Sequence, residues 1–279
     1  SLGAIYGGPS KSVVELAQAL GRSGISVDLV STNANGKNVI EEPTKTWIQK
    51  DSYRIQVFPC KIIGDYKLSL SLSQWLFQHV RDYEIIQTNA IFSLPNLPAY
   101  LACQLHNIPY TVIPRGMLEP WALSYKAGKK KAYYNLFEKP ALQKASAIQM
   151  LASTEAEQIK PLNLQSPLDI SPNGIHRQDV ESMPTGQVFY EQFPETKNKR
   201  IILFLGRIDP KKGIDLLATA FGKVSPQFPD AHLVVAGPDN IGFMDTARKY
   251  FSDSQCLDSV TFTGILSGEI KYSALAAAD

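Results

Sequence analysis

Residues 201–213, IILFLGRIDPKKG, constrain the fold more than any other stretch of this sequence. The apolar run at residues 201–205 does not alternate with polar residues, which predicts a parallel strand covered by helices on both faces. Gly206 ends the run, and Gly213 closes a turn before apolar residues at helical spacing in residues 214–224. The stretch therefore predicts a strand, a tight turn and a helix, the arrangement that forms the ligand-binding crevice of open α/β sheets.

Two basic residues flank this turn. Arg207 stands where the strand ends, and Lys212 stands just before the helix. A guanidinium offers a planar fork to phosphate oxygens, whereas an ammonium acts as a mobile point charge, so the pair suits a diphosphate. Hydrogen bonds to charged groups contribute about 1.5 to 3 kcal/mol each, more than the ~0.3 to 1 kcal/mol of a helix terminus. On position alone, two solvated surface cations explain the pattern equally well.

Strands alternate with helices along the chain, which predicts right-handed crossovers and parallel sheets. In the first half, strands are expected at residues 25–31, 54–58, 84–88, 110–113, 147–151 and 168–171. Residues 33–50 are polar and are expected to form an exposed loop or hairpin. Residues 177–199 lack periodicity and contain two prolines, which is typical of an interdomain connection. The sequence predicts an α/β protein of two Rossmann-like doubly wound domains that face a cleft, residues 1–178 and residues 179–279.

Composition excludes several classes of function. The net charge of +2 is too small to predict a nucleic-acid partner. Three separated cysteines without CxxC spacing predict neither a disulfide framework nor a zinc site, and the four histidines lie too far apart in sequence to suggest a metal cluster. The sequence contains neither a GxGxxG fingerprint nor a Walker A motif. No apolar run has the length of a membrane span and the first residues show no signal-peptide pattern, so we expect a cytoplasmic protein.

A glycine-rich loop at residues 6–10 precedes an expected helix. Gly7 and Gly8 would let a ligand approach the backbone closely, and the free amides of the helix start favour an anion or sugar oxygens. A single pair of glycines is weak evidence for such a site.

A second loop, residues 114–121, follows an expected central strand and carries Arg115, Glu119 and Trp121. Loops at this end of a parallel sheet line active sites. Trp121 could stack on the face of a sugar, although we judge core packing to be its more common role.

Residues 125–134 interleave lysines and tyrosines at the start of a helix expected to end near residue 145. The lysines are Lys126, Lys129, Lys130 and Lys131. Such a cluster can hold a protein on anionic lipid, each cation contributing about 1 kcal/mol near the surface. A solvated helix face is the more common explanation of such a run.

Five motifs occur in a fixed order along the chain. They are residues 6–10 with the following helix, PNGI at 172–175, FLGRIDPKKG at 204–213, VVAGP at 234–238 and VTFTG at 260–264. Together they resemble the GT-B glycosyltransferases of family 4, and the resemblance covers nearly the whole chain. It implies transfer of a sugar from a nucleotide-diphosphate donor, with retention of anomeric configuration and without a metal or other cofactor.

The resemblance also implies roles for individual residues. Arg207 and Lys212 would bind the donor diphosphate and stabilise charge on the departing nucleotide. The other donor-binding residues are expected to be Gly7, Gly8, Gly237, Gly264, Ile265 and Leu266. The acceptor-side residues are expected to be Arg115, Glu119 and Trp121.

Two departures from the family pattern bear on activity. Many relatives place a histidine in the loop after the strand at 110–113, where this sequence has Arg115. The Glu-x7-Glu element that contacts the donor sugar is expected beyond Asp279, and a first strand is expected before Ser1. The chain is therefore expected to be truncated at both ends and to be weakly active or inactive by itself.

The leading expectation is a retaining glycosyltransferase of polysaccharide biosynthesis, because residues 114–121 look like those of bacterial members of this kind. Its acceptor would be a saccharide or a lipid-linked saccharide, and the lysine cluster would place it at the inner face of the membrane. The alternatives are a soluble metabolite glycosyltransferase of the sucrose or trehalose type, and a non-catalytic nucleotide-sugar-binding module. The donor sugar and base, the acceptor, the linkage and the oligomeric state remain open.

Overall fold

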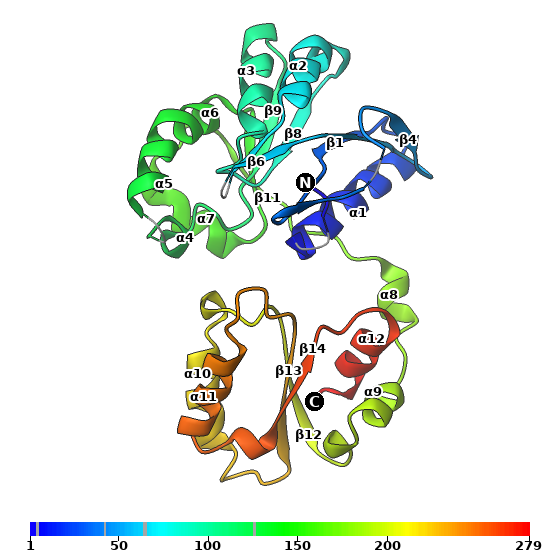
Figure 1. The fold of residues 1–279 in the computed structure, drawn as a ribbon, viewed down its shortest axis with the longest axis vertical. Coiled ribbons are helices and arrows are strands. Elements are labelled where there is room, and N and C mark those ends of the chain that lie inside the picture. The colour runs from blue at the N-terminus through cyan, green and yellow to red at the C-terminus, as the bar shows by residue number, and fades with distance from the viewer. Residues whose placement is uncertain (4–5, 42, 64–65, 125–126) are drawn as a thin grey trace. The chain divides into compact units, whose positions relative to one another are not determined.

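The computed structural model describes residues 1–3, 6–41, 43–63, 66–124 and 127–279. The chain divides into two compact units, Ser1–Gly174 and Ile175–Asp279 (Figure 1). In each unit, parallel strands lie between helices, as the alternating apolar segments predict. The division falls slightly before the boundary expected after residue 178.

The first unit contains two sheets. The larger sheet is parallel throughout and has the order β11-β10-β9-β8. Its strands are β8 (Ile86–Asn89), β9 (Tyr110–Ile113), β10 (Ala147–Met150) and β11 (Leu168–Ile170). In the smaller sheet, β1 (Asp28–Thr32) pairs in parallel with β5 (Arg54–Phe58), and β4 (Trp47–Gln49) pairs with β5 in the antiparallel direction. The sequence did not predict β4, because three residues are too few to show an alternating pattern.

Two short hairpins complete the strands described in the first unit. They are β2 (Ala34–Asn35) with β3 (Asn38–Val39), and β6 (Lys61–Ile63) with β7 (Tyr66–Leu68). The first hairpin lies in the segment expected to be a loop or hairpin, and Gly36 supplies the left-handed φ of 67° in its turn. The second hairpin was not predicted.

Helices cover the sheets of the first unit and bury a core of aliphatic and tyrosine side chains. They are α1 (Gly8–Arg22), α2 (Leu70–His79), α3 (Asn96–His106), α4 (Pro120–Ser124), α5 (Ala127–Tyr133), α6 (Lys139–Lys144) and α7 (Ser153–Ile159). Short 3₁₀ turns follow two of them, η2 (Val80–Asp82) and η4 (Lys160–Leu162). A π-helical turn, η3 (Tyr134–Glu138), joins α5 to α6 and therefore interrupts the regular helix expected to end near residue 145.

The second unit is built on one parallel sheet of the order β12-β13-β14. The strands are β12 (Arg200–Leu205), β13 (Ala231–Ala236) and β14 (Val260–Gly264). One face packs against α10 (Ile214–Val224) and α11 (Met244–Asp253), and the other packs against α9 (Gln187–Gln192) and α12 (Gly268–Ala277) (Figure 1). All six residues of β13 are buried because this strand lies between two neighbours.

The expectation that residues 201–205 form a strand buried on both faces is wrong in part. Ile202 is 42% exposed and Leu205 is 44% exposed, whereas Ile201 is fully buried. The reason is the position of β12 at the edge of the three-stranded sheet, where the covering helices reach only part of its surface. The apolar run predicted the strand correctly, but its place in the sheet depends on pairing.

Residues 177–199 also differ from the expected irregular connection. They contain α8 (Arg177–Glu181), α9 and a 3₁₀ turn, η5 (Pro194–Thr196). Phe189 in α9 is fully buried and packs into the core of the second unit against α12. The missing helical periodicity in sequence reflects the shortness of α9, which buries a cluster of aromatic residues rather than an extended stripe.

Candidate functional site

The loops that follow the three strands of the second unit are tied together at the carboxyl edge of the sheet. The Gly206 amide donates to the carbonyl of Ala236 at 2.9 Å, and the Gly237 amide donates to the carbonyl of Gly264 at 2.8 Å. These bonds bring three of the predicted motifs to one edge. The carboxyl ends of parallel strands are where ligands of such sheets bind.

Arg207 and Lys212 both project from the turn after β12. The guanidinium Nη2 of Arg207 lies 3.3 Å from Oδ2 of Asp209, and the side chain is 53% exposed. Oδ1 of Asp209 accepts from the Lys211 amide at 2.8 Å, which fixes the carboxylate in the turn η6 (Pro210–Lys212). Lys212 is exposed and its Cε lies 3.9 Å from the position that a Cβ of Gly206 would occupy. Both cations are therefore accessible to one anion.

The Arg207–Asp209 ion pair is weak enough to yield to such an anion. Exposed ion pairs contribute about 0 to 1 kcal/mol, whereas hydrogen bonds to charged groups contribute about 1.5 to 3 kcal/mol each. Asp209 therefore orients the guanidinium without preventing it from binding a ligand. The amino terminus of α10 lies beside the same turn and adds a smaller favourable field.

The predicted residues after β14 divide into two kinds. Gly264 has φ 71°, and Ile265 is 69% exposed. Leu266 is buried in the core with α9 and α12, so its side chain has a packing role. The expected contact of these residues with a nucleotide through main-chain groups stays a prediction.

Gly237 is required by a close approach of two backbones. A Cβ at this position would lie 1.7 Å from the carbonyl oxygen of Gly206. Gly237→Ala is therefore expected to lower the free energy of unfolding of the second unit by about 3 kcal/mol, the upper range for overpacking, and to weaken anion binding at Arg207. Chemical denaturation followed by circular dichroism measures the change. Gly206→Ala is the matched control, because its Cβ would make only ordinary contacts, and equal stability of both variants would contradict the prediction.

In the first unit, Arg115 lies at the centre of a polar cluster from four segments. Its Nε and Nη2 donate to Oδ1 of Asn89 at 3.2 and 2.8 Å. Nη1 donates to Oγ of Ser12 at 2.9 Å and to Oδ1 of Asn173 at 3.4 Å. These partners come from the end of β8, from α1 and from the PNGI motif, so the structure joins three predicted features at the carboxyl edge of the larger sheet.

The backbone and charge of Arg115 are both constrained. The residue has φ 56°, a left-handed conformation that is unfavourable for a side chain of this size. Burial lowers the pKa of the guanidinium, and the charge of Glu155 acts in the opposite direction. Glu155 is itself buried, and its two oxygens accept from the amides of Gly116 and Leu151 at 2.6 and 2.7 Å. This carboxylate holds the loops after β9 and β10.

The other predicted residues of the first unit lie around this cluster. Gly7 has φ 64° and precedes α1, and a Cβ at Gly7 or Gly8 would meet no atom within 4 Å. Oε1 of Glu119 lies 3.4 Å from the position of a Cβ on Gly116. Trp121 is 49% exposed, so the preference for core packing is wrong. The reason is that α4 buries Ala122 instead.

Sequence reasoning missed several polar residues of the first-unit cluster. They are Ser12, Asn89, Glu138, Glu155 and Asn173. Asn89 and Asn173 each follow a predicted strand, so the rule that strand ends carry site residues could have found them. The buried glutamates gave no such signal, because Glu138 accepts from Phe92 and Glu155 accepts from Gly116, which lie 46 and 39 residues away in sequence.

Comparison with known proteins agrees with this geometry. The family model "Glycosyltransferase Family 4" matches residues 6–179, and the model "Glycosyl transferases group 1" matches residues 188–279. The chain belongs to glycosyltransferase family 4. A search of curated proteins found no match.

Solved structures of glycosyltransferases share its fold. Sucrose-phosphate synthase from Thermosynechococcus elongatus aligns with a TM-score of 0.69 at 19% identity, over 98% of this chain and 68% of that one. HepE from Anabaena, in complex with UDP and glucose, aligns with a TM-score of 0.64 at 16% identity, over 98% and 69%. A trehalose-6-phosphate structure from E. coli bound with UDP-2-fluoro glucose gives 0.66 at 9% identity, over 98% and 74%. The predicted family and the GT-B fold class are thereby confirmed.

The lysine cluster of this glycosyltransferase, Lys126, Lys129, Lys130 and Lys131, is only partly described, and one of its members makes contacts within the protein. Lys126 lies outside the described residues, as does the side chain of Lys129. Nζ of Lys130 donates to the carbonyl of Ala122 at 2.7 Å and lies 5.5 Å from the ring centroid of Phe92. Lys131 is exposed.

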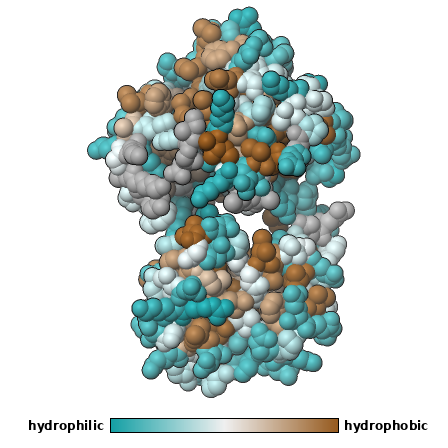
Figure 2. All heavy atoms as spheres, in the orientation of Figure 1, coloured by the Kyte–Doolittle hydropathy of each residue, from teal (hydrophilic) through white to brown (hydrophobic). Residues whose placement is uncertain are grey.

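No described helix has the length and apolar character needed to span a membrane. On the face shown in Figure 2, apolar residues form separate groups among polar ones. Among the described residues, no group of three or more His, Cys, Asp or Glu side chains could hold a metal ion.

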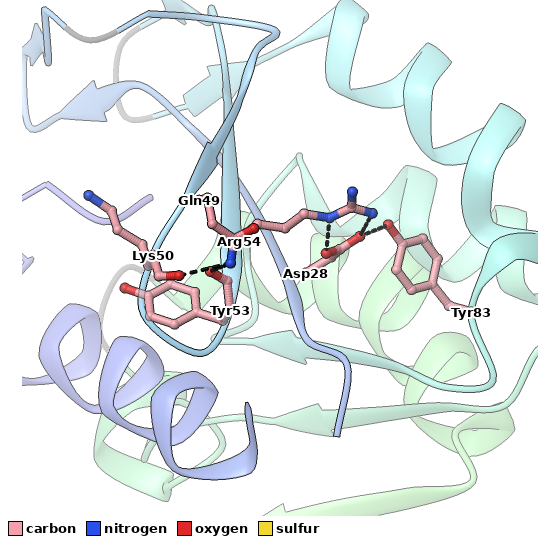
Figure 3. Close-up of polar contacts among 6 residues, drawn as sticks. All are labelled: Asp28, Gln49, Lys50, Tyr53, Arg54 and Tyr83. Carbon is pink, nitrogen blue, oxygen red and sulfur yellow. Dashed lines mark hydrogen bonds and ion pairs between the residues drawn. The ribbon is translucent and has the colours of Figure 1, made fainter. Parts of the chain in front are cut away.

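A cavity of about 630 Å³ lies near the amino ends of β1 and β8. Three of its lining residues form a network that joins separate segments (Figure 3). Nε and Nη2 of Arg54 donate to the two carboxylate oxygens of Asp28 at 2.5 and 2.7 Å, and the Tyr83 hydroxyl donates to Oδ2 at 2.6 Å. Burial by itself would raise the pKa of Asp28, but the hydrogen bonds from Arg54 and Tyr83 outweigh it and lower the pKa. This network links β1, β5 and the segment before β8.

Proposed function

We propose that this family member is a retaining glycosyltransferase that moves a sugar from a nucleotide-diphosphate donor to a saccharide or lipid-linked acceptor in polysaccharide biosynthesis. The observation that carries the donor half is the accessible pair Arg207 and Lys212 at the carboxyl end of β12. The bond from Gly206 to Ala236 ties this turn to the end of β13, and the bond from Gly237 to Gly264 ties the end of β13 to β14, which supports a preformed donor site.

The two cations would act where negative charge develops. In the proposed reaction, the bond between the sugar and the diphosphate breaks and charge accumulates on the departing nucleotide. Arg207 and Lys212 would hold the diphosphate oxygens and stabilise that charge in place, which costs no reorganisation during the reaction. The backbone of Gly237, Gly264, Ile265 and Leu266 would contact the base and ribose.

The first donor to test is UDP-glucose. HepE from Anabaena was solved with UDP and glucose, and the E. coli structure holds UDP-2-fluoro glucose. Both share the fold of this chain at low identity, so they support the choice of probe rather than the identity of the natural donor.

The acceptor side would be formed by the Arg115 cluster. Its amide and hydroxyl partners, Asn89, Ser12 and Asn173, provide a polar surface suited to sugar hydroxyls. Glu119 adds a carboxylate from the same loop as Arg115, and the half-exposed side chain of Trp121 suits a sugar face. Gly7 and Gly8 leave the start of α1 open to a ligand.

Two alternatives to this function have support. A soluble sucrose- or trehalose-type transferase is supported by the fold shared with the sucrose-phosphate synthase of T. elongatus. A non-catalytic nucleotide-sugar-binding module would keep the same donor residues. We favour the polysaccharide function because residues 114–121 resemble bacterial enzymes of that kind.

One assay separates these alternatives. The 279-residue chain, and any longer natural protein that contains it, are incubated with UDP-glucose labelled in the sugar and with a bacterial lipid extract. Labelled product in the organic phase or in a polymeric saccharide is expected, and label in a small water-soluble sugar would instead support the metabolite function. If the longest form of the protein binds UDP-glucose but makes no product, the result would support the non-catalytic nucleotide-sugar-binding module.

A cytoplasmic location with contact to anionic membrane is part of the same proposal. Lys131 is the exposed lysine that supports it, whereas Lys130 already binds Ala122. Flotation with vesicles of phosphatidylglycerol measures this contact, and flotation that is unchanged in Lys131→Ala would oppose it.

A further inference from the structure

Glu138 is a fully buried carboxylate in the π-helical turn η3. Its Oε1 accepts from the amide of Phe92 at 2.6 Å, and its Oε2 has no hydrogen-bond partner among the described residues. A buried oxygen without a partner costs free energy, and π turns are common at functional positions. The arrangement therefore calls for an explanation beyond packing.

The groups around Glu138 compensate its charge poorly. Tyr133 and Tyr134 face it from its own helical segment and Tyr100 faces it from α3. The hydroxyls of Tyr133 and Tyr134 also lack hydrogen-bond partners within the described part of the chain. Lys130, on the same helical segment, lies over the ring of Phe92 with its Nζ 5.5 Å from the ring centroid. Burial raises the pKa of Glu138 to about 7, and hydrogen bonds from two backbone amides act in the opposite direction.

The amides that Glu138 holds belong to the loop between β8 and α3, and the backbone of this loop is strained. Ala90 has φ 64° and Phe92 has φ 55°, both in the left-handed region that favours glycine. Nδ2 of Asn96 donates to the carbonyl of Ala90 at 2.8 Å from the other end of the loop. Glu138 and Asn96 thus hold a conformation that the chain would not adopt without them.

The same loop begins at Asn89, whose Oδ1 accepts both hydrogen bonds from Arg115. A continuous path of contacts therefore runs from the Glu138 carboxylate through the loop backbone to the guanidinium. Asn89 is the only residue of this path whose side chain touches Arg115 among the described contacts.

We propose that Glu138 is a positioning residue, and that its carboxylate fixes the loop after β8 and thereby the Asn89–Arg115 hydrogen bonds of the acceptor side. The ionised carboxylate is the stronger acceptor for the loop amides. Protonation turns one oxygen into a donor that can serve the hydroxyl of Tyr133 or Tyr134, and it weakens the hold on the loop. The importance of this device for catalysis rests on the proposed function of Arg115.

Glu155 provides a natural comparison. It is also buried and also holds a site loop, but both of its oxygens accept from backbone amides. Only Glu138 combines a satisfied oxygen with one that lacks a partner. Replacing Glu155 changes a buried carboxylate under the same site and leaves the proposed device intact.

Nuclear magnetic resonance on the ¹⁵N-labelled chain tests the proposal without any substrate. Between pH 5 and pH 9, the amide signals of Phe92 and Ser93 and the Nε–H signal of Arg115 are expected to shift with a common midpoint near pH 7. In Glu138→Gln, which keeps an acceptor for Phe92, all three shifts are expected to vanish. In Glu155→Gln they are expected to remain.

Either of two outcomes overturns the proposal. An Arg115 signal that does not follow the Phe92 signal would show that Glu138 does not reach the guanidinium, and an unchanged titration in Glu138→Gln would assign it to another group. The pH profile of sugar transfer is measured separately. A coupled titration without effect on transfer would refute the acceptor role of Arg115 and leave the positioning role standing.

Discussion

Arg207→Ala is expected to weaken the binding of UDP by about ten- to a hundredfold. The substitution removes a forked donor from the proposed diphosphate site, and each hydrogen bond to a charged group contributes about 1.5 to 3 kcal/mol. The side chain is half exposed and its ion pair with Asp209 is weak, so the fold should lose little stability. Isothermal titration calorimetry with UDP, together with thermal unfolding of the free variant, measures both quantities.

Lys212→Ala is expected to have an effect of similar size, because both cations project from one turn. The double variant shows whether they hold one ligand, since residues that bind the same diphosphate should not have additive effects. Lys223→Ala, at the far end of α10, is the control for loss of one positive charge. If all three single variants bind UDP equally well, the turn after β12 is not the donor site.

Glu138→Gln is expected to remove about 3 kcal/mol of pH dependence from the unfolding of the first unit. Burial raises the folded pKa of Glu138 from 4.5 to about 7, so the folded state binds more protons than the unfolded state between these values. The stability from this group is complete below about pH 4.5 and is lost as the pH rises through 7. Glutamine does not titrate, so the variant should lack this decline.

Urea denaturation at a series of pH values from 4.5 to 8 measures the difference. All three tryptophans, Trp47, Trp75 and Trp121, lie in the first unit, so their fluorescence reports its unfolding. Subtracting the variant from the wild type cancels other groups, including His232, whose pKa is lowered by burial. Glu155→Gln should retain the decline. Parallel curves for the wild type and Glu138→Gln would contradict the prediction.

Glu138 thus combines lower stability above neutral pH with a firmer hold on the loop that carries Asn89. This combination of lower stability and a fixed loop is typical of functional sites, where strained or poorly compensated groups persist because the surrounding structure holds them in place. The left-handed backbone at Ala90, Phe92 and Arg115 is consistent with this view.

Much of the fold could be predicted because buried parallel strands are visible in the sequence as continuous apolar runs. The strand β9 begins and ends where the apolar pattern predicts, and β13 is a continuous apolar run with every residue buried. The parts that failed depend on distant partners. Residues 200–205 lie at a sheet edge only because β13 pairs with β14 on its other side, and α9 is a helix of the second unit because Phe189 packs against α12.

The candidate site also has residues that the sequence identified and contacts that only the structure revealed. Arg207 and Lys212 could be found because a strand, a turn and a helix lie within thirteen consecutive residues, so their proximity is set by local geometry. Arg115 could be found because it follows a strand end. Its contacts with Asn89 and Ser12 could not, since they join segments separated by long stretches of chain.

The sequence by itself determined the two units with parallel sheets, the family, and the pair of cations in the turn after β12. Tertiary structure decided which apolar residues stay exposed, which glycine allows two backbones to meet, and where the buried carboxylates act. The physical reason is the range of the interactions involved. Hydrophobic pattern and turn geometry are properties of neighbouring residues, whereas the environment of Glu138 is created by Tyr100 and Phe92, which only folding brings to it.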